Sequence, residues 1–125
     1  MVITVDKLSD APLYLQLRDA VIAGIASGEL RPGDALPSVR SLAEDLGLNL
    51  HTVNKAYATL RDEGYVIMLG RRGAYVADAP ADPAAGMDEA ALEAALTKLA
   101  TEFKASGGTR HAFLAAAKRA ARNLD

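Results

Sequence analysis

Residues 38–64 constrain the fold most, because they contain two short helical patterns that meet at a tight turn. Ser38 precedes the first pattern, which stops at Gly47, and Asn49 precedes the second, which stops at Gly64. Ser and Asn are favoured at helix N-termini, and Gly is favoured just beyond helix C-termini. The apolar stripes are Val39, Leu42, Ala43 and Leu46 in the first pattern, and Val53, Ala56, Tyr57 and Leu60 in the second. This segment therefore predicts two helices with a tight turn between them.

The segments on either side complete a recognisable order of elements. Residues 12–28 predict an earlier helix with an apolar stripe of Tyr14, Leu17, Val21 and Ile25. Residues 29–37 predict a short rigid connector because they contain two prolines. Residues 65–77 contain two β-rich runs around Gly70 and Gly73, which is the pattern of a hairpin. Three helices followed by a hairpin predict a winged helix-turn-helix, in a chain that is mainly α with a small β-hairpin.

The C-terminal third predicts a separate helical region. We expect a winged helix-turn-helix domain over residues 1–78, a linker rich in Pro and Ala over 79–87, and a two-helix dimerisation region over 88–125. A two-helix hairpin cannot bury its apolar stripes alone, so a second copy of the chain is the favoured partner, although packing within one subunit stays an alternative. The candidate dimerisation residues are Leu15 and Ile22 on the first helix, and Leu92, Leu96, Leu99, Phe103, Phe113 and Leu114 in the hairpin.

Short polar side chains gather at the start of the third predicted helix. The N-terminal end of a recognition helix enters the major groove, where Asn, His and Thr can bond base edges and Lys can reach phosphate. The two arginines at the hairpin tip can bond phosphate oxygens, and the glycines beside them allow close approach. The candidate DNA-binding residues are Arg40, Asn49, His51, Thr52, Asn54, Lys55, Gly70, Arg71, Arg72 and Gly73.

Net charge argues against simple attraction to nucleic acid. The chain carries a formal charge of −2, and residues 1–78 contain eight Lys or Arg against ten Asp or Glu. Any contact with DNA must therefore come from a local positive set, formed by Arg40, Lys55, Arg71 and Arg72. We expect weaker nonspecific binding than a basic domain shows.

The stretch PLYLQLRDAVIAGIASGELRPGDALPSVRSLAEDLGLNLHTVNKAYATLRDEGYV, followed by RRGAYV, resembles the N-terminal domain of GntR-family regulators. The short tail resembles the YtrA-type subfamily, whose members carry two C-terminal helices for dimerisation in place of a large effector domain. The resemblance implies a homodimer that binds a palindromic double-stranded DNA operator, and it implies repression. The chain departs from the subfamily at Leu50 and His51, where Asn-Pro-Asn-Thr is usual, so the operator sequence is not predicted.

By the same resemblance, Arg40 occupies the position of a DNA-contacting arginine, and Gly73 matches the wing glycine. Asn49, Thr52 and Lys55 also fall on matching positions. Several candidates have a plainer interpretation from chemistry alone. Arg40 can lie over its own helix, Lys55 can pair with Asp62 or with solvent, and the arginines of the tip can simply be solvated. His51 can be an ordinary surface histidine. Tyr57 and Tyr75 fall on apolar positions and are expected to pack rather than to stack on bases.

Composition limits the other classes of function. The chain has no Cys and only two distant His, so it offers no thiolate metal site and no nucleophile with a base; we expect no enzyme, no cofactor and no metal. No apolar run approaches the ~20 residues of a membrane span, which predicts no membrane contact and a cytoplasmic protein. The alternative to DNA binding is a winged-helix module that binds protein. The sequence does not say whether a small-molecule effector controls the chain, because the short tail shows no recognisable cavity or convergent polar set.

Overall fold

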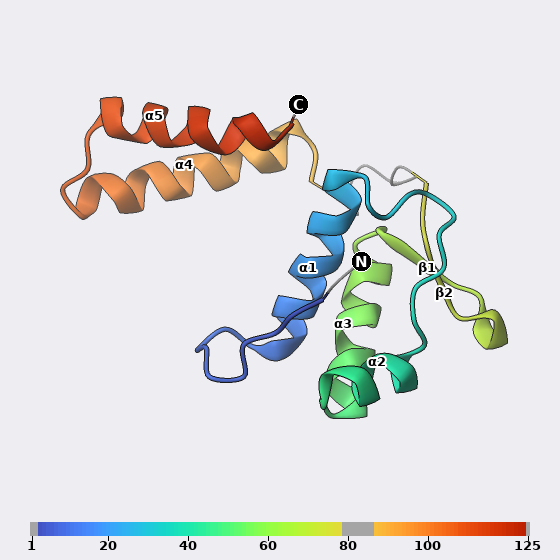
Figure 1. Cartoon of the computed structure of the whole chain (residues 1–125). Helices are drawn as coiled ribbons and strands as arrows, with labels where there is room; N and C mark the ends of the chain where they lie inside the picture. The colour runs from blue at the N-terminus through green and yellow to red at the C-terminus, as the bar shows by residue number, and fades with distance from the viewer. Residues whose placement is uncertain (1–2, 79–86, 125) are drawn as a thin grey trace. The chain divides into compact units, whose positions relative to one another are not determined.

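The computed structural model describes residues 3–78 and 87–124, which belong to two compact units, Met1–Gly86 and Met87–Asp125 (Figure 1). The predicted linker at 79–87 lies outside the described residues except for Met87. The first unit contains α1 (Leu13–Ser27), α2 (Val39–Leu46), α3 (Leu50–Asp62), β1 (Val66–Met68), a 3-10 turn η1 (Gly70–Arg72) and β2 (Ala74–Val76). The second contains α4 (Glu89–Ala105), α5 (Arg110–Ala121) and a 3-10 turn η2 (Arg122–Leu124).

The helix boundaries of the first unit follow the predicted caps. The Ser38 side chain accepts a hydrogen bond from the Ser41 N–H, and the Asn49 side chain accepts one from the His51 N–H at 2.8 Å. Gly47 ends α2 in a left-handed conformation with φ of 64°. The predicted winged helix-turn-helix, mainly α with a small β-hairpin, is confirmed.

Helix α3 forms the centre of the core, with α1 and α2 packed against it (Figure 1). Its predicted stripe is buried, since Val53, Ala56, Tyr57 and Leu60 are each at most 1% exposed. The Tyr57 hydroxyl donates a hydrogen bond to the Pro37 carbonyl at 2.7 Å, which satisfies its one polar group. Burying this stripe fixes the rotation of α3, so its other face must point outward.

Strands β1 and β2 pair antiparallel, with Val66 opposite Val76 and Met68 opposite Ala74, as the hairpin pattern predicted. The connector at 29–37 does more than join helices. The Gly33 and Leu36 N–H groups donate to the carbonyls of Val76 and Ala74, each at 2.8 Å. The connector thus lies beside β2 and pairs with it through an isolated antiparallel bridge between Ala35 and Tyr75. The prediction missed this pairing because two prolines in the connector indicate a turn.

The second unit is a helical hairpin, and each of its two helices begins at a side-chain cap. Asp88 caps α4 by accepting from the Ala91 N–H at 2.8 Å, and Thr109 caps α5 by accepting from the Ala112 N–H at 3.2 Å. The rings of Phe103 and Phe113 lie 6.2 Å apart, centre to centre. None of the described side chains of this unit is buried. The hairpin therefore has little core of its own.

Candidate nucleic-acid interface

The start of α3 presents the polar set that the sequence predicted. We call Asn49, His51, Thr52, Asn54 and Lys55 the polar tip. All of them are exposed except Thr52, which is partly buried. They lie opposite the buried stripe of α3, and the positive end of the helix dipole lies among them. Such an end favours a nearby anion.

Asn49 caps α3 through one half of its side-chain amide. Its Oδ1 accepts a hydrogen bond from the His51 N–H at 2.8 Å. The nitrogen of the same amide is a hydrogen-bond donor, and the residue is exposed. The predicted capping by Asn49 is confirmed, and its predicted contact with DNA stays a prediction that the exposed amide nitrogen allows.

Arg40 lies in the first turn of α2 with an exposed side chain. Alongside the turn between α2 and α3, the Lys7 ammonium donates to the Gly47 carbonyl at 3.0 Å. This contact ties the N-terminal segment to the helix-turn-helix. Sequence reasoning missed Lys7, because the contact spans 40 residues and residues 1–10 show no periodic pattern.

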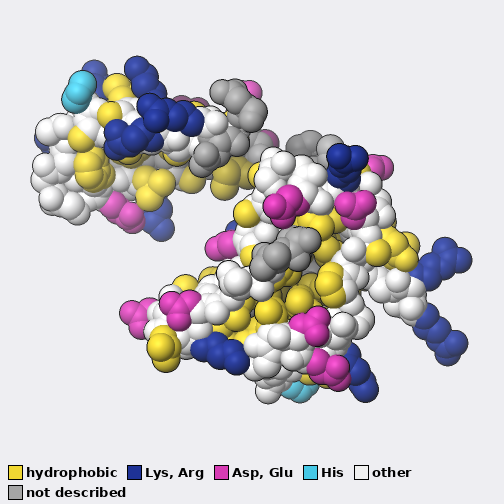
Figure 2. Space-filling view, in the orientation of Figure 1, with side chains coloured by type: hydrophobic (Ala, Val, Ile, Leu, Met, Phe, Trp, Pro, Cys, Tyr) yellow, Lys and Arg dark blue, Asp and Glu magenta, His cyan; other side chains and the backbone are white. Residues whose placement is uncertain are grey.

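We call residues 66–76 the wing. A tight 3-10 turn at its tip, between β1 and β2, holds Arg71 and Arg72, which are both exposed. Lys and Arg side chains project from this end of the molecule in Figure 2. The turn requires glycine on both sides, since Gly70 has φ of 59° and Gly73 has φ of 91° with ψ of −157°. The conformation of Gly73 is one that only glycine adopts readily. The predicted glycines thus shape the tip, and nothing lies within 4 Å of where their side chains would begin.

The Lys55 side chain is exposed, and it also contacts a ring of another helix, which the sequence did not predict. Its ammonium lies over the ring of Tyr14, 4.1 Å from the ring centre. Asp62, the partner considered above, instead pairs with Arg61 at 3.1 Å. Lys55 and Tyr14 line an open notch of about 350 Å³ together with Leu13, His51 and Thr52. Sequence reasoning assigned Tyr14 to the core stripe of α1, and no local signal marked its second role.

A bidentate ion pair joins α1 to the residue that follows α3 at its C-terminal end. Arg18 on α1 donates two hydrogen bonds to the Glu63 carboxylate, at 2.8 and 2.6 Å, and a third to Asp19. These carboxylates, with Glu63 first, raise the pKa of Arg18 above its usual range. Arg18 therefore stabilises the α1–α3 contact and is not part of the polar tip.

The predicted dimerisation residues divide between the two units. On α1, Leu15 and Ile22 are partly buried, and Ile22 packs against the core of its own unit. In the hairpin, Leu92, Leu96, Leu99, Phe103 and Leu114 are 38–55% exposed, and Phe113 is partly buried. We call these six hairpin residues the apolar hairpin face.

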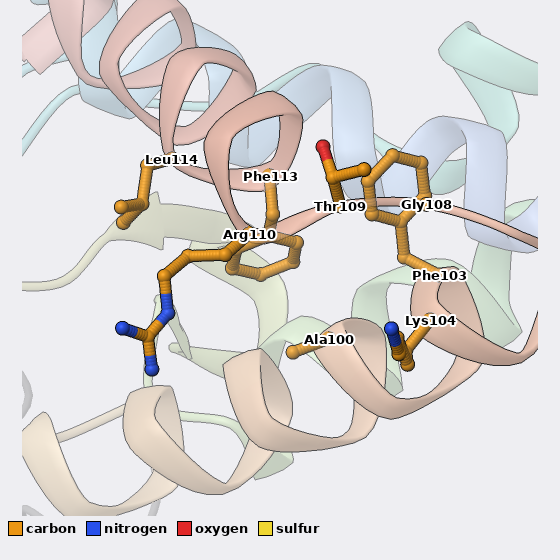
Figure 3. Close-up of a pocket in the computed structure, with 8 residues that line it drawn as sticks. All are labelled: Ala100, Phe103, Lys104, Gly108, Thr109, Arg110, Phe113 and Leu114. Carbon is orange, nitrogen blue, oxygen red and sulfur yellow. The ribbon is translucent and has the colours of Figure 1, made fainter.

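A groove of about 460 Å³ crosses the α4–α5 turn and is walled by Phe103 and Phe113, with Lys104 and Arg110 at its rim (Figure 3). The Phe103 ring lies against Gly108, where an added Cβ would meet ring carbons at 2.4 Å. Only a residue without a side chain therefore permits this packing of the ring. The groove is continuous with the apolar hairpin face because both include Phe103, Phe113 and Leu114.

Within residues 3–78 and 87–124, no cluster of three or more His, Asp or Glu side chains is placed to hold a metal ion. Among the same residues, no helix has the length and apolar character needed to cross a membrane.

Comparison with protein families gives a match over the first unit. The model described as bacterial regulatory proteins, gntR family, matches residues 13–76. The HTH-type transcriptional repressor YtrA of Bacillus subtilis is 40% identical over 76 residues, and the transcriptional regulator Rv1152 of Mycobacterium tuberculosis is 43% identical over 72 residues. These alignments cover 61% and 58% of this chain, and 58% and 60% of the relatives, so the chain spans less than two thirds of either relative.

Solved structures agree with this match. YtrA from Sulfolobus acidocaldarius, a GntR-family transcription factor, is 47% identical with a TM-score of 0.58, over 62% of this chain and 82% of that one. The DNA-binding domain of AraR, solved in complex with operator ORX1, is 26% identical with a TM-score of 0.54, over 62% of this chain and 95% of that one. A transcriptional antiterminator from Listeria monocytogenes is 22% identical and shares the fold across the whole chain and 94% of its own, with a TM-score of 0.83.

Proposed function

Because the chain belongs to the gntR family of bacterial regulatory proteins, we propose that it is a sequence-specific DNA-binding regulator of transcription rather than an enzyme. One observation carries the proposal: the buried stripe of α3 leaves the polar tip outside, at the end of the helix that a helix-turn-helix inserts into the major groove. AraR, whose related domain was solved on an operator, supports the same mode of binding for this chain.

Each part of the interface has a separate task in this proposal. Asn49, His51, Thr52 and Asn54 offer donors and acceptors to base edges, and they specify the sequence. Arg40 and Lys55 bond the phosphate backbone beside α3. Residues 70–73 of the wing place two guanidiniums on the neighbouring backbone or in the minor groove, where Gly70 and Gly73 keep the turn narrow.

We further propose that two copies associate through the apolar hairpin face and bind a palindrome as a homodimer. The two α3 helices would then lie about 34 Å apart, one turn of the duplex. Exposed leucines at helical spacing support this assembly, because a hairpin without a core gains stability when a second copy covers it. The resemblance to YtrA of Bacillus subtilis, a repressor, favours repression by occupancy of the operator.

Selection from a pool of random duplexes tests DNA binding. The wild-type chain should enrich a sequence with inverted half-sites and bind it at least a hundredfold more tightly than bulk DNA at physiological salt. His51→Ala with Asn54→Ala should remove most of this discrimination, because each base contact contributes about 1–3 kcal/mol. Neither position caps α3, so the helix should stay formed.

Arg61→Gln is a matched control on the same helix, because Arg61 is exposed at the opposite end and pairs only with Asp62 among the described residues. It should bind the selected site as the wild type does. If the pool yields no sequence preferred over bulk DNA, the proposal is wrong, and the surface would belong to a winged-helix module that binds protein.

A further inference from the structure

The contact between Tyr14 and Lys55 joins the start of α1 to the polar tip of α3. The Lys55 ammonium lies 4.1 Å from the centre of the Tyr14 ring, well inside the range of a cation–π interaction. The Thr59 hydroxyl donates to the Lys55 carbonyl at 2.8 Å, which adds a bond to the turn of α3 that carries Lys55. The ammonium is thus held by a ring from another helix.

We infer that Tyr14 is a positioning residue, which holds the Lys55 ammonium in place for a phosphodiester of the DNA backbone that binds in the notch between α1 and α3. The inference rests on the proposed function and assigns to α1 a part in DNA binding. An ammonium above a ring face makes its contact through one side, and its N–H groups on the other side still point outward as donors.

The notch has the electrostatics that a phosphodiester requires. Of the five residues that line it, Lys55 supplies a full positive charge, His51 and Thr52 supply polar groups, and none is acidic. Helices α1 and α3 both begin at this notch, at Leu13 and Leu50, so the positive ends of two helix dipoles lie beside it. The volume of about 350 Å³ is open to solvent and admits a backbone segment from outside.

Holding Lys55 in advance changes its contribution to binding. A free lysine has four rotatable carbon–carbon bonds and loses that freedom when it grips a phosphate. A ring that already restricts the side chain lowers this entropic cost. The expected gain is about two- to fivefold in affinity for each copy of the chain on DNA.

A double-mutant cycle tests the inference, with affinity measured on the sequence selected by the wild-type chain. Tyr14→Leu removes the ring but keeps an apolar side chain against the core, and it should weaken binding two- to fivefold per copy. Lys55→Gln should weaken binding more and reduce the slope of log affinity against log salt by about 0.9 per copy. The double variant should bind like Lys55→Gln alone, because the ring acts only through the ammonium.

Tyr14→Phe is the conservative control, since it keeps the ring face and removes only the hydroxyl; it should bind like the wild type. If Tyr14→Leu weakens binding equally with and without Lys55, the ring acts through folding alone and the inference is wrong. It is also wrong if Tyr14→Phe loses as much as Tyr14→Leu, because the hydroxyl would then be the contact. Absence of any preferred sequence for the wild type would instead overturn the proposed function.

Discussion

Leu99→Ser is expected to weaken self-association of the chain about 30-fold. Leu99 lies in the middle of the apolar hairpin face and is 55% exposed within one chain. Burying a whole leucine side chain contributes about 2 kcal/mol, so covering the exposed half contributes about 1 kcal/mol. A symmetric dimer contains the residue twice, and the loss is then about 2 kcal/mol, or roughly 30-fold in Kd.

Sedimentation equilibrium across a range of chain concentrations gives the Kd directly. Leu8→Ser is the matched control, because it makes the same substitution at a side chain that is 96% exposed and lies in the other unit. The far-UV circular dichroism of each variant shows whether α4 still forms. Burial of Leu99 between copies is refuted if the wild type sediments as a monomer at every concentration, or if Leu8→Ser weakens association as much as Leu99→Ser.

Three further predictions concern stability. Burial raises the pKa of Tyr57 to about 12. As the pH rises, the unfolded chain therefore loses the phenolic proton of Tyr57 before the folded chain does, and the free energy of unfolding should fall by roughly 2–3 kcal/mol between about pH 10 and pH 12. Tyr57→Phe should lack this part of the fall when the two proteins are compared by denaturant titration. Gly73→Ala should destabilise the first unit by about 1–3 kcal/mol in thermal unfolding, because φ of 91° with ψ of −157° suits only glycine. Gly70→Asn should cost less, since φ of 59° is tolerated by Asn, and equal losses at both positions would contradict this account. Arg18→Met and Glu63→Gln should show a coupling energy of about 1 kcal/mol in a double-mutant cycle, because the pair is bidentate but about 30% exposed.

Much of the first unit could be predicted from sequence because its signals are local. Ser38 and Asn49 cap the helices that follow them, and the 3.6-residue period of Val53, Tyr57 and Leu60 identifies the buried face of α3. Once the buried face of α3 is known, the polar side chains near the N-terminus of α3 that lie off this face are expected to be exposed. The polar tip was therefore predictable from the sequence.

The contacts that escaped prediction join residues far apart in the chain. Lys55 meets Tyr14 across 41 positions, and neither residue carries a local pattern that names the other. The pairing of Leu36 with Ala74 escaped for the same reason, since the prolines around it indicate only a turn. The sequence placed Tyr14 on the apolar stripe of α1, and its side chain does pack against the core. The contact of its ring with the Lys55 ammonium was not predicted. Periodicity identifies the face of a helix that is buried, but not the side chains of other helices that lie beside it.

The proposed function requires a net acidic unit to offer local positive charge to DNA, and the arrangement of its ion pairs shows how it could. Arg18 and Arg61 are both paired with carboxylates at 2.6–3.1 Å, so two of the eight basic residues cancel nearby acids. In the described residues, no such pair involves Arg40, Lys55 or the two arginines of the wing.

At physiological salt, charges separated by more than about 8 Å are largely screened, so a bound phosphate would respond to these nearby cations rather than to the net charge of the unit. Binding to random DNA sums many weak contacts over the whole surface, so it should be poor. Binding to the correct site should instead depend on the few unpaired cations and on base contacts. In the proposed function, the chain should therefore separate specific from nonspecific sites through the position of its charges, so that its net charge alone would underestimate its affinity for the right sequence.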